Sequence, residues 1–326
     1  MFWNGTRALV TGGAGFVGSH LVDALLAAGA QVTVLDNLSA GRPENLRHVA
    51  DRITFIEGDV RDETTVARAV RDQEFVFHLA ANADVPQSVK DPRYDFESNA
   101  VGSYHVWRAC LAAGVGRVIF SSSAAVYGEP LRRPMDEDHP LRPISPYGAS
   151  KVAGEMLGFA YHHTYGLPFT AMRIFNAYGE RLSRYVIYDL LAKLERSPDD
   201  LEVLGDGRQV RDYCYVADTC RAFLLAAQCG AALGQAINVA GGHPIPIADL
   251  VSLLLRLLHL EGRTRVHYTG TSWQGDIKTL HADTRKAQHL LGFAPQVPLE
   301  EGLSRVIGWL RRERGWTFGA SGCDSG

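Results

Sequence analysis

The sequence predicts an α/β protein built on a doubly wound parallel sheet, with a smaller, discontinuous lobe in the C-terminal half. Short apolar runs of the kind that form buried parallel strands alternate with helical patterns through the first half of the chain. The first run, at residues 7–11, leads through a glycine-rich turn into a helical pattern. A length of 326 residues allows one large domain of this class with an appended lobe.

The glycine-rich turn has the spacing of a dinucleotide-binding loop. Gly12, Gly15 and Gly18 follow the pattern G-x-x-G-x-x-G, in which glycines allow a tight turn and a close approach of the backbone to a pyrophosphate. Phe16 and Val17 lie between the last two glycines, where the following helix would present its N-terminus to the phosphates. We therefore predict a Rossmann-type nucleotide domain.

The end of the second predicted strand selects the dinucleotide. Asp36 stands about 20 positions beyond the glycines, where an acidic side chain bonds the ribose 2′-hydroxyl and repels a 2′-phosphate. NAD is therefore the expected cofactor, in preference to NADP. Its other contacts are expected at the carboxyl ends of the strands, at Asn37, Asp59, Val60, Leu79, Ala80, Ala81 and Ser121.

The remaining elements follow from apolar runs, helical spacing and chain breakers. Strands are expected at residues 7–11, 31–35, 53–57, 75–79, 118–121, 169–175 and 201–204. Helices are expected at residues 19–28, 63–70, 97–113, 147–165, 184–194, 216–229 and 247–258. We predict an NAD-binding domain of residues 1–175 plus about 211–240, a substrate lobe of about 176–210 plus 241–318, and a small, polar, disordered tail at 319–326.

A tyrosine and a lysine lie four residues apart at the start of the predicted helix 147–165. Tyr147 and Lys151 would therefore project from one helix face. A nearby ammonium group favours the phenolate and lowers the pKa of a tyrosine from its usual value of ~10, which makes Tyr147 a candidate base. Pro146 suits the first turn of this helix. Taken alone, such a pair is also compatible with a solvated helix face.

Several segments together resemble the extended short-chain dehydrogenase/reductase family, and within it the nucleotide-sugar 4-epimerases of the UDP-glucose 4-epimerase type. These segments are TGGAGFVGSH, LDNLS, GDVRD, FHLAA, FSSSAAVYGEP, SPYGASK, RIFNAYG and LGDGRQVRDYCYVAD. The resemblance implies that Ser123, Tyr147 and Lys151 are catalytic and that Asn99 lies near the nicotinamide. It also implies a UDP-sugar that is oxidised at C4, turns as a 4-keto sugar and receives the hydride on its other face.

The resemblance further implies a set of substrate contacts. They are Ser123, Ala124, Tyr147, Asn176, Arg184, Leu204, Arg211 and Asp276. Arg211 would bind the diphosphate, for which a guanidinium is well suited. The chain departs from the family at Ala83, where a lysine or polar residue is common, and at Trp273, where an arginine usually contacts the diphosphate.

Ala124 and Ala125 stand where related 4,6-dehydratases carry an Asp-Glu pair. A methyl group cannot transfer a proton, so these alanines argue against elimination at C5 and C6. The sequence is still compatible with a UDP-N-acetylhexosamine or a UDP-hexuronate as substrate, with a net oxidoreductase, and with a non-catalytic NAD sensor. Leu280, at the family's gatekeeper position, has an intermediate size that leaves N-acetyl groups possible.

Composition sets further limits. The charge balance of 33 basic against 36 acidic residues gives no electrostatic signature for nucleic acid. No apolar run is long enough for a membrane span and no signal peptide precedes the first strand, so the expected compartment is the cytoplasm. The five cysteines lack a CxxC pair and are expected to be reduced, and no metal is expected. Similar proteins form homodimers, which we expect here through helices 97–113 and 147–165.

Overall fold

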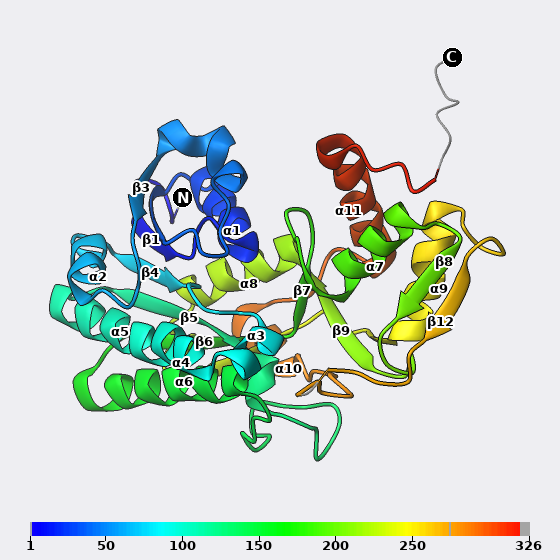
Figure 1. Ribbon diagram of the computed structural model, residues 1–326. Coiled ribbons are helices and arrows are strands. Elements are labelled where there is room, and N and C mark those ends of the chain that lie inside the picture. The colour runs from blue at the N-terminus through cyan, green and yellow to red at the C-terminus, as the bar shows by residue number, and fades with distance from the viewer. Residues whose placement is uncertain (1, 274, 320–326) are drawn as a thin grey trace.

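The computed structural model describes residues 2–273 and 275–319. Its centre is a seven-stranded parallel sheet with the strand order β10-β6-β5-β4-β1-β2-β3 (Figure 1). The strands are β1 (Arg7–Thr11), β2 (Gln31–Asp36), β3 (Ile53–Glu57), β4 (Phe75–His78), β5 (Arg117–Ser123), β6 (Phe169–Ile174) and β10 (Ala236–Val239). The strand order runs outward from β1 in both directions, so the predicted doubly wound class is confirmed. Strand β10 is the member that the sequence patterns did not predict.

Helices cover both faces of this sheet. On one face α1 (Phe16–Ala27) packs against α8 (Val216–Gln228). On the other, α5 (Gly102–Ala113) lies between α2 (Glu63–Val70) and α6 (Pro146–Tyr165). Successive residues of β1 serve opposite faces, with Ala8 and Val10 in one core cluster and Leu9 in the other. Both faces of each central strand must therefore be apolar, which explains the continuous apolar runs in the sequence.

The second lobe contains two small sheets, one ordered β11-β9-β7 and one that pairs β12 with β8. Their strands are β7 (Asn176–Tyr178), β8 (Asp200–Val203), β9 (Val210–Tyr215), β11 (Pro244–Pro246) and β12 (Arg265–Tyr268). Helix α7 (Tyr185–Arg196) packs against β8, and α9 (Ile247–Leu258) packs against α11 (Leu299–Arg314), on the right of Figure 1. The core cluster beneath α1 and α8 continues into this lobe through Leu201, Leu254 and Leu303, so the two lobes share one core.

The predicted domain boundaries need correction in two places. Residues 211–215, predicted for the first domain, form most of β9, which pairs with β7 and β11 of the second lobe. The chain returns to the first domain only with α8. Conversely, α10 (Arg285–Leu291), predicted for the second lobe, packs against β10 and α8. Of the predicted tail at 319–326, residues 320–326 lie outside the described residues.

Helix α6 carries the Tyr147 and Lys151 pair, and its start follows from local sequence. The Ser145 hydroxyl caps the helix by accepting a hydrogen bond from the Gly148 amide at 3.1 Å, and Pro146 occupies the first turn. The helix ends at Gly166, which has a left-handed φ of +75°. Both boundaries were therefore predictable from capping residues.

The predicted helix 97–113 is interrupted. Residues Glu97–Val101 form a π-helical turn, η2, before α5 begins at Gly102. Such turns are often found at functional sites because they displace the side chains of one helical face. The remaining short segments are η1 (Pro43–Arg52), α3 (Val85–Lys90), α4 (Pro92–Phe96), η3 (Ala124–Val126) and η4 (Gly230–Ala232).

Within residues 2–273 and 275–319, no helix combines the length and apolarity that a membrane crossing requires. The same residues include no group of three or more His, Cys, Asp or Glu side chains placed to bind a metal ion. Cys110, Cys214, Cys220 and Cys229 are free thiols, and Cys323 lies outside the described residues.

A buried ion pair fixes α6 to the sheet. The Arg173 guanidinium on β6 donates to both carboxylate oxygens of Glu155 on α6, with distances of 2.8 Å from Nε to Oε1 and 3.0 Å from Nη2 to Oε2. Arg173 also donates to the Tyr127 hydroxyl at 2.9 Å, and both charged side chains are almost completely buried. A buried pair with this geometry is satisfied only while both partners remain.

We expect Glu155→Ala to lower the free energy of unfolding by ~3–5 kcal/mol, because it leaves the Arg173 charge buried and unpaired. Replacing both residues by methionine should recover much of this loss, since no charge then remains to be solvated. Urea unfolding of the three proteins measures both effects. Equal stability of the single and double variants would contradict the importance of the pair.

Candidate active site

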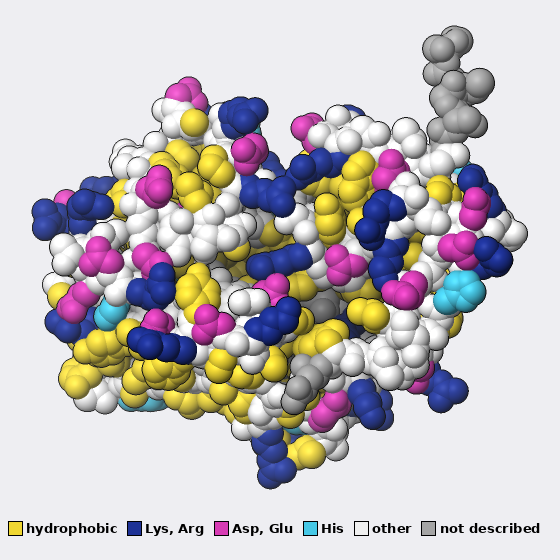
Figure 2. Space-filling model, viewed as in Figure 1, with side chains coloured by type: hydrophobic (Ala, Val, Ile, Leu, Met, Phe, Trp, Pro, Cys, Tyr) yellow, Lys and Arg dark blue, Asp and Glu magenta, His cyan; other side chains and the backbone are white. Residues whose placement is uncertain are grey.

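A cavity of about 1190 Å³ lies between the carboxyl edge of the large sheet and the second lobe. Every predicted site residue except Asn99 lines it, although these residues are spread from Gly12 to Asp276. Basic side chains surround the hollow between the lobes (Figure 2). Those that line the cavity are Arg42, Arg181, Arg184, Lys193, Arg196 and Arg211 together with Lys151. The cavity is thus suited to a ligand that carries phosphate groups.

The glycine loop permits close backbone contact at one end of the cavity. Gly12 has a φ of +71°, and a Cβ there would stand 2.7 Å from the Ala80 amide nitrogen. A Cβ on Gly18 would stand 2.1 Å from the Gly12 carbonyl oxygen. Both positions therefore require glycine, and α1 begins directly beyond Gly15, at Phe16. The N-terminus of α1 thus lies at the end of the cavity where the sequence predicts the pyrophosphate of the dinucleotide.

Asp36 is held at the wall by backbone amides. Its carboxylate accepts hydrogen bonds from Ala14 at 2.9 Å and from Leu38 at 2.8 Å. Burial raises the pKa of Asp36, while these two bonds oppose the shift. Gly41 passes so close that a Cβ there would lie 2.7 Å from the carboxylate. The fixed carboxylate retains free lone pairs for a ribose hydroxyl.

Asp59 forms the adjoining part of this wall and remains ionised. Burial alone would raise its pKa, but hydrogen bonds from Arg61 and Asn37 outweigh burial and lower the pKa to about 2. The Arg61 guanidinium donates to both Asp59 oxygens, at 3.0 and 2.8 Å, and the Asn37 amide donates at 2.7 Å. Asp59 thus presents a fixed acceptor to the end of the cavity predicted for the adenine.

Lys151 lines the cavity beside Tyr147. Its Nζ donates to the Ser121 carbonyl at 2.8 Å and stands 5.9 Å from the centre of the Tyr147 ring. Burial lowers the pKa of Lys151 to about 8, although the charges of Asp95 and Glu155 act in the opposite direction. The lysine can therefore lose its proton within the pH range in which enzymes work.

The expected effect of Lys151 on Tyr147 needs correction. In the protein alone, burial raises the pKa of Tyr147, and the nearby Tyr185 adds to the increase. The groups that oppose this increase in pKa are the Ser123 hydroxyl and the Arg184 charge, and not Lys151. The phenol and the lysine share one helix face as predicted, but among the described residues the Lys151 Nζ makes its hydrogen bond to the Ser121 carbonyl and not to the Tyr147 hydroxyl. In the protein alone, burial and Tyr185 thus favour the neutral phenol.

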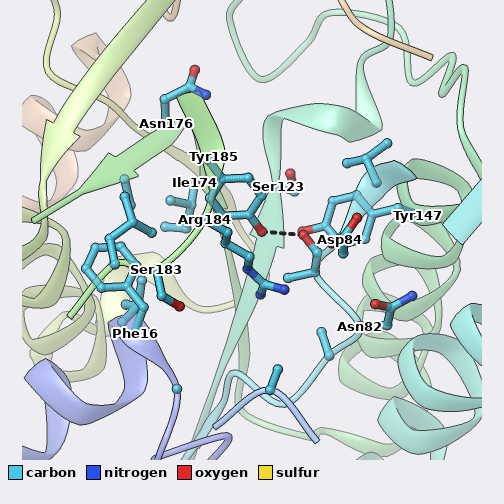
Figure 3. A pocket seen from close by; sticks show the side chains of 18 of the residues that line it. Phe16, Asn82, Asp84, Ser123, Tyr147, Ile174, Asn176, Ser183, Arg184 and Tyr185 are labelled. Carbon is cyan, nitrogen blue, oxygen red and sulfur yellow. Dashed lines mark hydrogen bonds between the residues drawn. The ribbon is translucent and has the colours of Figure 1, made fainter. Parts of the chain in front are cut away.

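Ser123 ends β5 and faces the cavity with Tyr147 (Figure 3). Its Oγ accepts a hydrogen bond from the Ala125 amide at 3.2 Å, which fixes the side chain and begins the short helix η3. The hydroxyl proton remains available for a ligand. Ala124 and Ala125 also line the cavity, and neither offers a proton-transferring group there.

Asn99 does not reach the cavity, contrary to the prediction. It lies in the π-helical turn and is almost fully buried. Its Oδ1 accepts from the Asn82 amide at 2.7 Å, and its Nδ2 donates to Asp95 at 3.1 Å and to Ser150 at 3.0 Å. Asn99 therefore joins the loop after β4 to α6 and supports the part of the cavity wall that these two segments form.

Where the second lobe lines the cavity, two of the predicted substrate-binding residues contact each other. The Arg211 Nη2 donates to Asp276 at 2.5 Å, so part of the guanidinium charge is already compensated within the protein. Leu204, at the end of β8, and Trp273 line the same region. Trp273 offers an aromatic face, and no charge, at the position where the family pattern has an arginine.

Several cavity residues were missed by sequence reasoning. Ser122 Oγ, Gln209 Oε1 and Tyr213 OH are buried and make no hydrogen bond with the described residues, and the same is true of Asn176 Oδ1 among the predicted ones. Buried polar atoms are nearly always paired, so these atoms indicate the contact surface of a polar ligand. Gln209 and Tyr213 lie within the segment LGDGRQVRDYCYVAD, but nothing in that segment shows which side chains face inward.

Comparison with known proteins agrees with this geometry. The family model described as the NAD dependent epimerase/dehydratase family matches residues 8–240. The chain belongs to this family. It is 36% identical over 314 residues to a UDP-glucose 4-epimerase of Mycolicibacterium smegmatis, covering 94% of this chain and 99% of the relative. It is also 34% identical over 322 residues to a dTDP-glucose 4,6-dehydratase of Actinoplanes sp., covering 95% and 99%.

Among solved structures, the UDP-glucose 4-epimerase of Thermotoga maritima with UDP-glucose superposes with a TM-score of 0.89 and 36% identity, covering 95% of this chain and 100% of that one. The protein is therefore an NAD-dependent enzyme of the nucleotide-sugar epimerase/dehydratase class. The residues present fit NAD: the two crowded glycines, the fixed Asp36 carboxylate and the ionised Asp59 occur in the places that such a dinucleotide needs.

We expect the stability of the wild type, relative to Lys151→Met, to rise between pH 8 and pH ~10.4. In that window the unfolded lysine is still protonated, while the folded lysine, with a pKa of about 8, has lost its proton. The unfolded state thus binds more protons, so stability increases with pH. Urea unfolding of both proteins at pH 7, 8, 9 and 10 tests this. A difference that stays constant would show that the pKa of Lys151 is not depressed.

Proposed function

We propose that the protein epimerises C4 of a UDP-hexose, of the UDP-glucose/UDP-galactose type, through a transient 4-keto sugar. The observation that carries this proposal is the catalytic wall: Ser123 and Tyr147 face the cavity beside an NAD-type loop, while the neighbouring positions are alanines. Such a wall supports oxidation and reduction at C4 but supplies no acid or base for C5 or C6.

Each protein group has a defined task in this reaction. Tyr147 accepts the proton of the sugar 4-hydroxyl, and Ser123 donates a hydrogen bond to the same oxygen. Lys151, held by the Ser121 carbonyl, supplies positive charge behind the wall and donors for the cofactor ribose. When bound, NAD supplies the acceptor and donor of the C4 hydride and adds positive charge near Tyr147. That charge favours the phenolate against the effect of burial.

The second lobe would hold the nucleotide diphosphate. Arg211 provides a guanidinium oriented by Asp276, and the same cavity is lined by Asn176, Gln209 and Tyr213, each of which has a buried oxygen without a hydrogen-bond partner among the described residues. Leu204 and Trp273 add apolar surface for a base or sugar. If these residues bind only the nucleotide, the sugar can rotate in the cavity, as epimerisation at C4 requires.

A UDP-hexuronate is the second candidate, and Arg184 is the observation that favours it. Its guanidinium lies 5.0 Å from the centre of the Tyr185 ring and is close enough to Tyr147 to influence the phenol. No carboxylate among the described residues forms an ion pair with it. Its charge is therefore available for a C6 carboxylate, or for a phosphate. A panel of UDP-glucose, UDP-N-acetylglucosamine and UDP-glucuronate, followed by chromatography, distinguishes these substrates.

In deuterated water, the product of a C4 epimerase should carry no carbon-bound deuterium, because the hydrogen that leaves C4 returns to it. A dehydratase removes a proton next to the 4-keto group, so its product would carry deuterium at C5. Mass spectrometry of the product measures this difference. Stoichiometric incorporation by the wild type would exclude the proposal.

We also expect Tyr147→Phe to lose ~10²–10⁴ in rate, the usual contribution of a positioned proton-transfer group. Its affinity for NAD should change little, because the glycine loop and Asp36 remain. Initial rates and calorimetric titration with NAD measure the two properties. Retention of activity would assign the proton transfer to another group.

We further propose that the protein is a homodimer formed through α5 and α6. Large hydrophobic side chains are exposed on α6 and the neighbouring α4, where Figure 2 shows yellow surface at the lower left. They include Phe96, Met156, Leu157 and Tyr165. A two-fold contact would bury one such face against its copy.

Introducing a charge into this face should produce a monomer. We expect Met156→Glu to halve the mass measured by light scattering at micromolar concentration, because the proposed contact would bury a charged carboxylate of each protomer without a partner. Leu131→Glu is the matched control, since Leu131 is an exposed hydrophobic residue of another surface loop. A wild-type monomer would contradict the proposed assembly.

A further inference from the structure

Tyr185 crosses the cavity from one lobe to the other. It is the first residue of α7, which packs against β8 of the second lobe. Its hydroxyl donates a hydrogen bond to the carbonyl of Ala83, in the loop that follows β4 of the large sheet and is 102 residues distant in sequence. Figure 3 shows this bond as a dashed line in the pocket, between the segment of Arg184 and Tyr185 and that of Asp84.

The backbone of Tyr185 is in an unfavourable conformation. Its φ is +70°, a value that is uncommon for any residue with a Cβ and an outlier for a bulky one. Arg181, in the same cavity-lining segment, also has a positive φ, of +65°. Strained residues persist when surrounding contacts hold them in place, and they concentrate at ligand clamps and switches. The contacts of Tyr185, among them the bond to Ala83, therefore hold its backbone in this conformation.

The ring of Tyr185 lies beside the catalytic wall. Arg184 stands over it at 5.0 Å, and the phenol is close enough to Tyr147 to raise its pKa. Both Tyr185 and Ala83 line the cavity. The bond between them thus crosses the cavity near Tyr147, at the end where the proposed function places the sugar, which we call the sugar end.

We propose that Tyr185 is a positioning residue that fastens the two lobes across the sugar end and retains the 4-keto sugar while it turns. This inference rests on the proposed 4-epimerisation for the identity of the retained sugar. The contact itself needs only the observed bond. Ala83 accepts through its backbone, so the bond depends on the Tyr185 hydroxyl and on no other side chain.

The test compares Tyr185→Phe with Tyr188→Phe. The first removes only the bridging hydroxyl. The second removes a hydroxyl one turn later on the same helix, from a ring that packs against Trp316 at 5.6 Å and does not line the cavity. Two quantities are measured: amide hydrogen exchange of residues 82–86 and 181–187 without substrate, and the free 4-keto sugar released per turnover, trapped by borodeuteride.

We expect Tyr185→Phe to raise both quantities by about two- to tenfold, the range given by loss of one neutral hydrogen bond. Tyr188→Phe should match the wild type in both. Unchanged exchange in Tyr185→Phe would overturn the fastening role, and increased exchange with unchanged ketone release would overturn retention.

The experiment distinguishes failure of the 4-epimerase proposal from failure of the role proposed for Tyr185. A wild type that turns over no UDP-sugar fails the 4-epimerase proposal, while the exchange data still decide whether Tyr185 fastens the lobes. In that case the dissociation rate of UDP from the NAD-loaded enzyme replaces ketone release, with the same expected increase. Tyr185→Gly, which accepts a positive φ without strain, provides a second variant with the contact removed. Wild-type exchange and UDP release in this variant would also overturn the inference.

Discussion

Close packing of α6 on the large sheet places Tyr147 and Lys151, and the rest of the site depends on it. Gly154 and Gly158 have no room for a Cβ, which would stand 2.9 Å from the Phe120 ring and 2.3 Å from the Phe169 ring. The helix therefore approaches the strands closely enough for Lys151 to reach a β5 carbonyl. The Glu155–Arg173 pair holds it there. One helix thus fixes both the lysine and, one turn earlier, Tyr147.

This arrangement has an electrostatic cost that explains why the cofactor matters to the acid–base chemistry. The same burial that orders Tyr147 and Lys151 raises the pKa of the phenol and lowers that of the ammonium group. Both shifts favour neutral side chains, whereas the proposed reaction needs a phenolate near a cation. A positively charged ligand at the adjoining wall would reverse this preference. In the proposed reaction, proton transfer would therefore depend on occupation of the NAD site.

Very few side chains would distinguish a 4-epimerase from a 4,6-dehydratase in this family. The chain is about equally identical to a UDP-glucose 4-epimerase and to a dTDP-glucose 4,6-dehydratase, at 36% and 34%. Overall similarity therefore cannot select the reaction. The proposed choice of reaction rests instead on the side chains after Ser123, because elimination needs an acid and a base and these positions carry methyl groups.

The sequence by itself determined the sheet class, the glycine loop, Asp36 and the Tyr147–Lys151 pair, because local periodicity and short motifs carry these features. Only the tertiary structure decided features that depend on distant segments. In the tertiary structure Asn99 lies behind the cavity wall, β9 pairs with strands of the second lobe, and Tyr185 is hydrogen-bonded to Ala83. Side-chain direction, strand pairing and burial arise from contacts between residues far apart in the chain, and no local pattern records them.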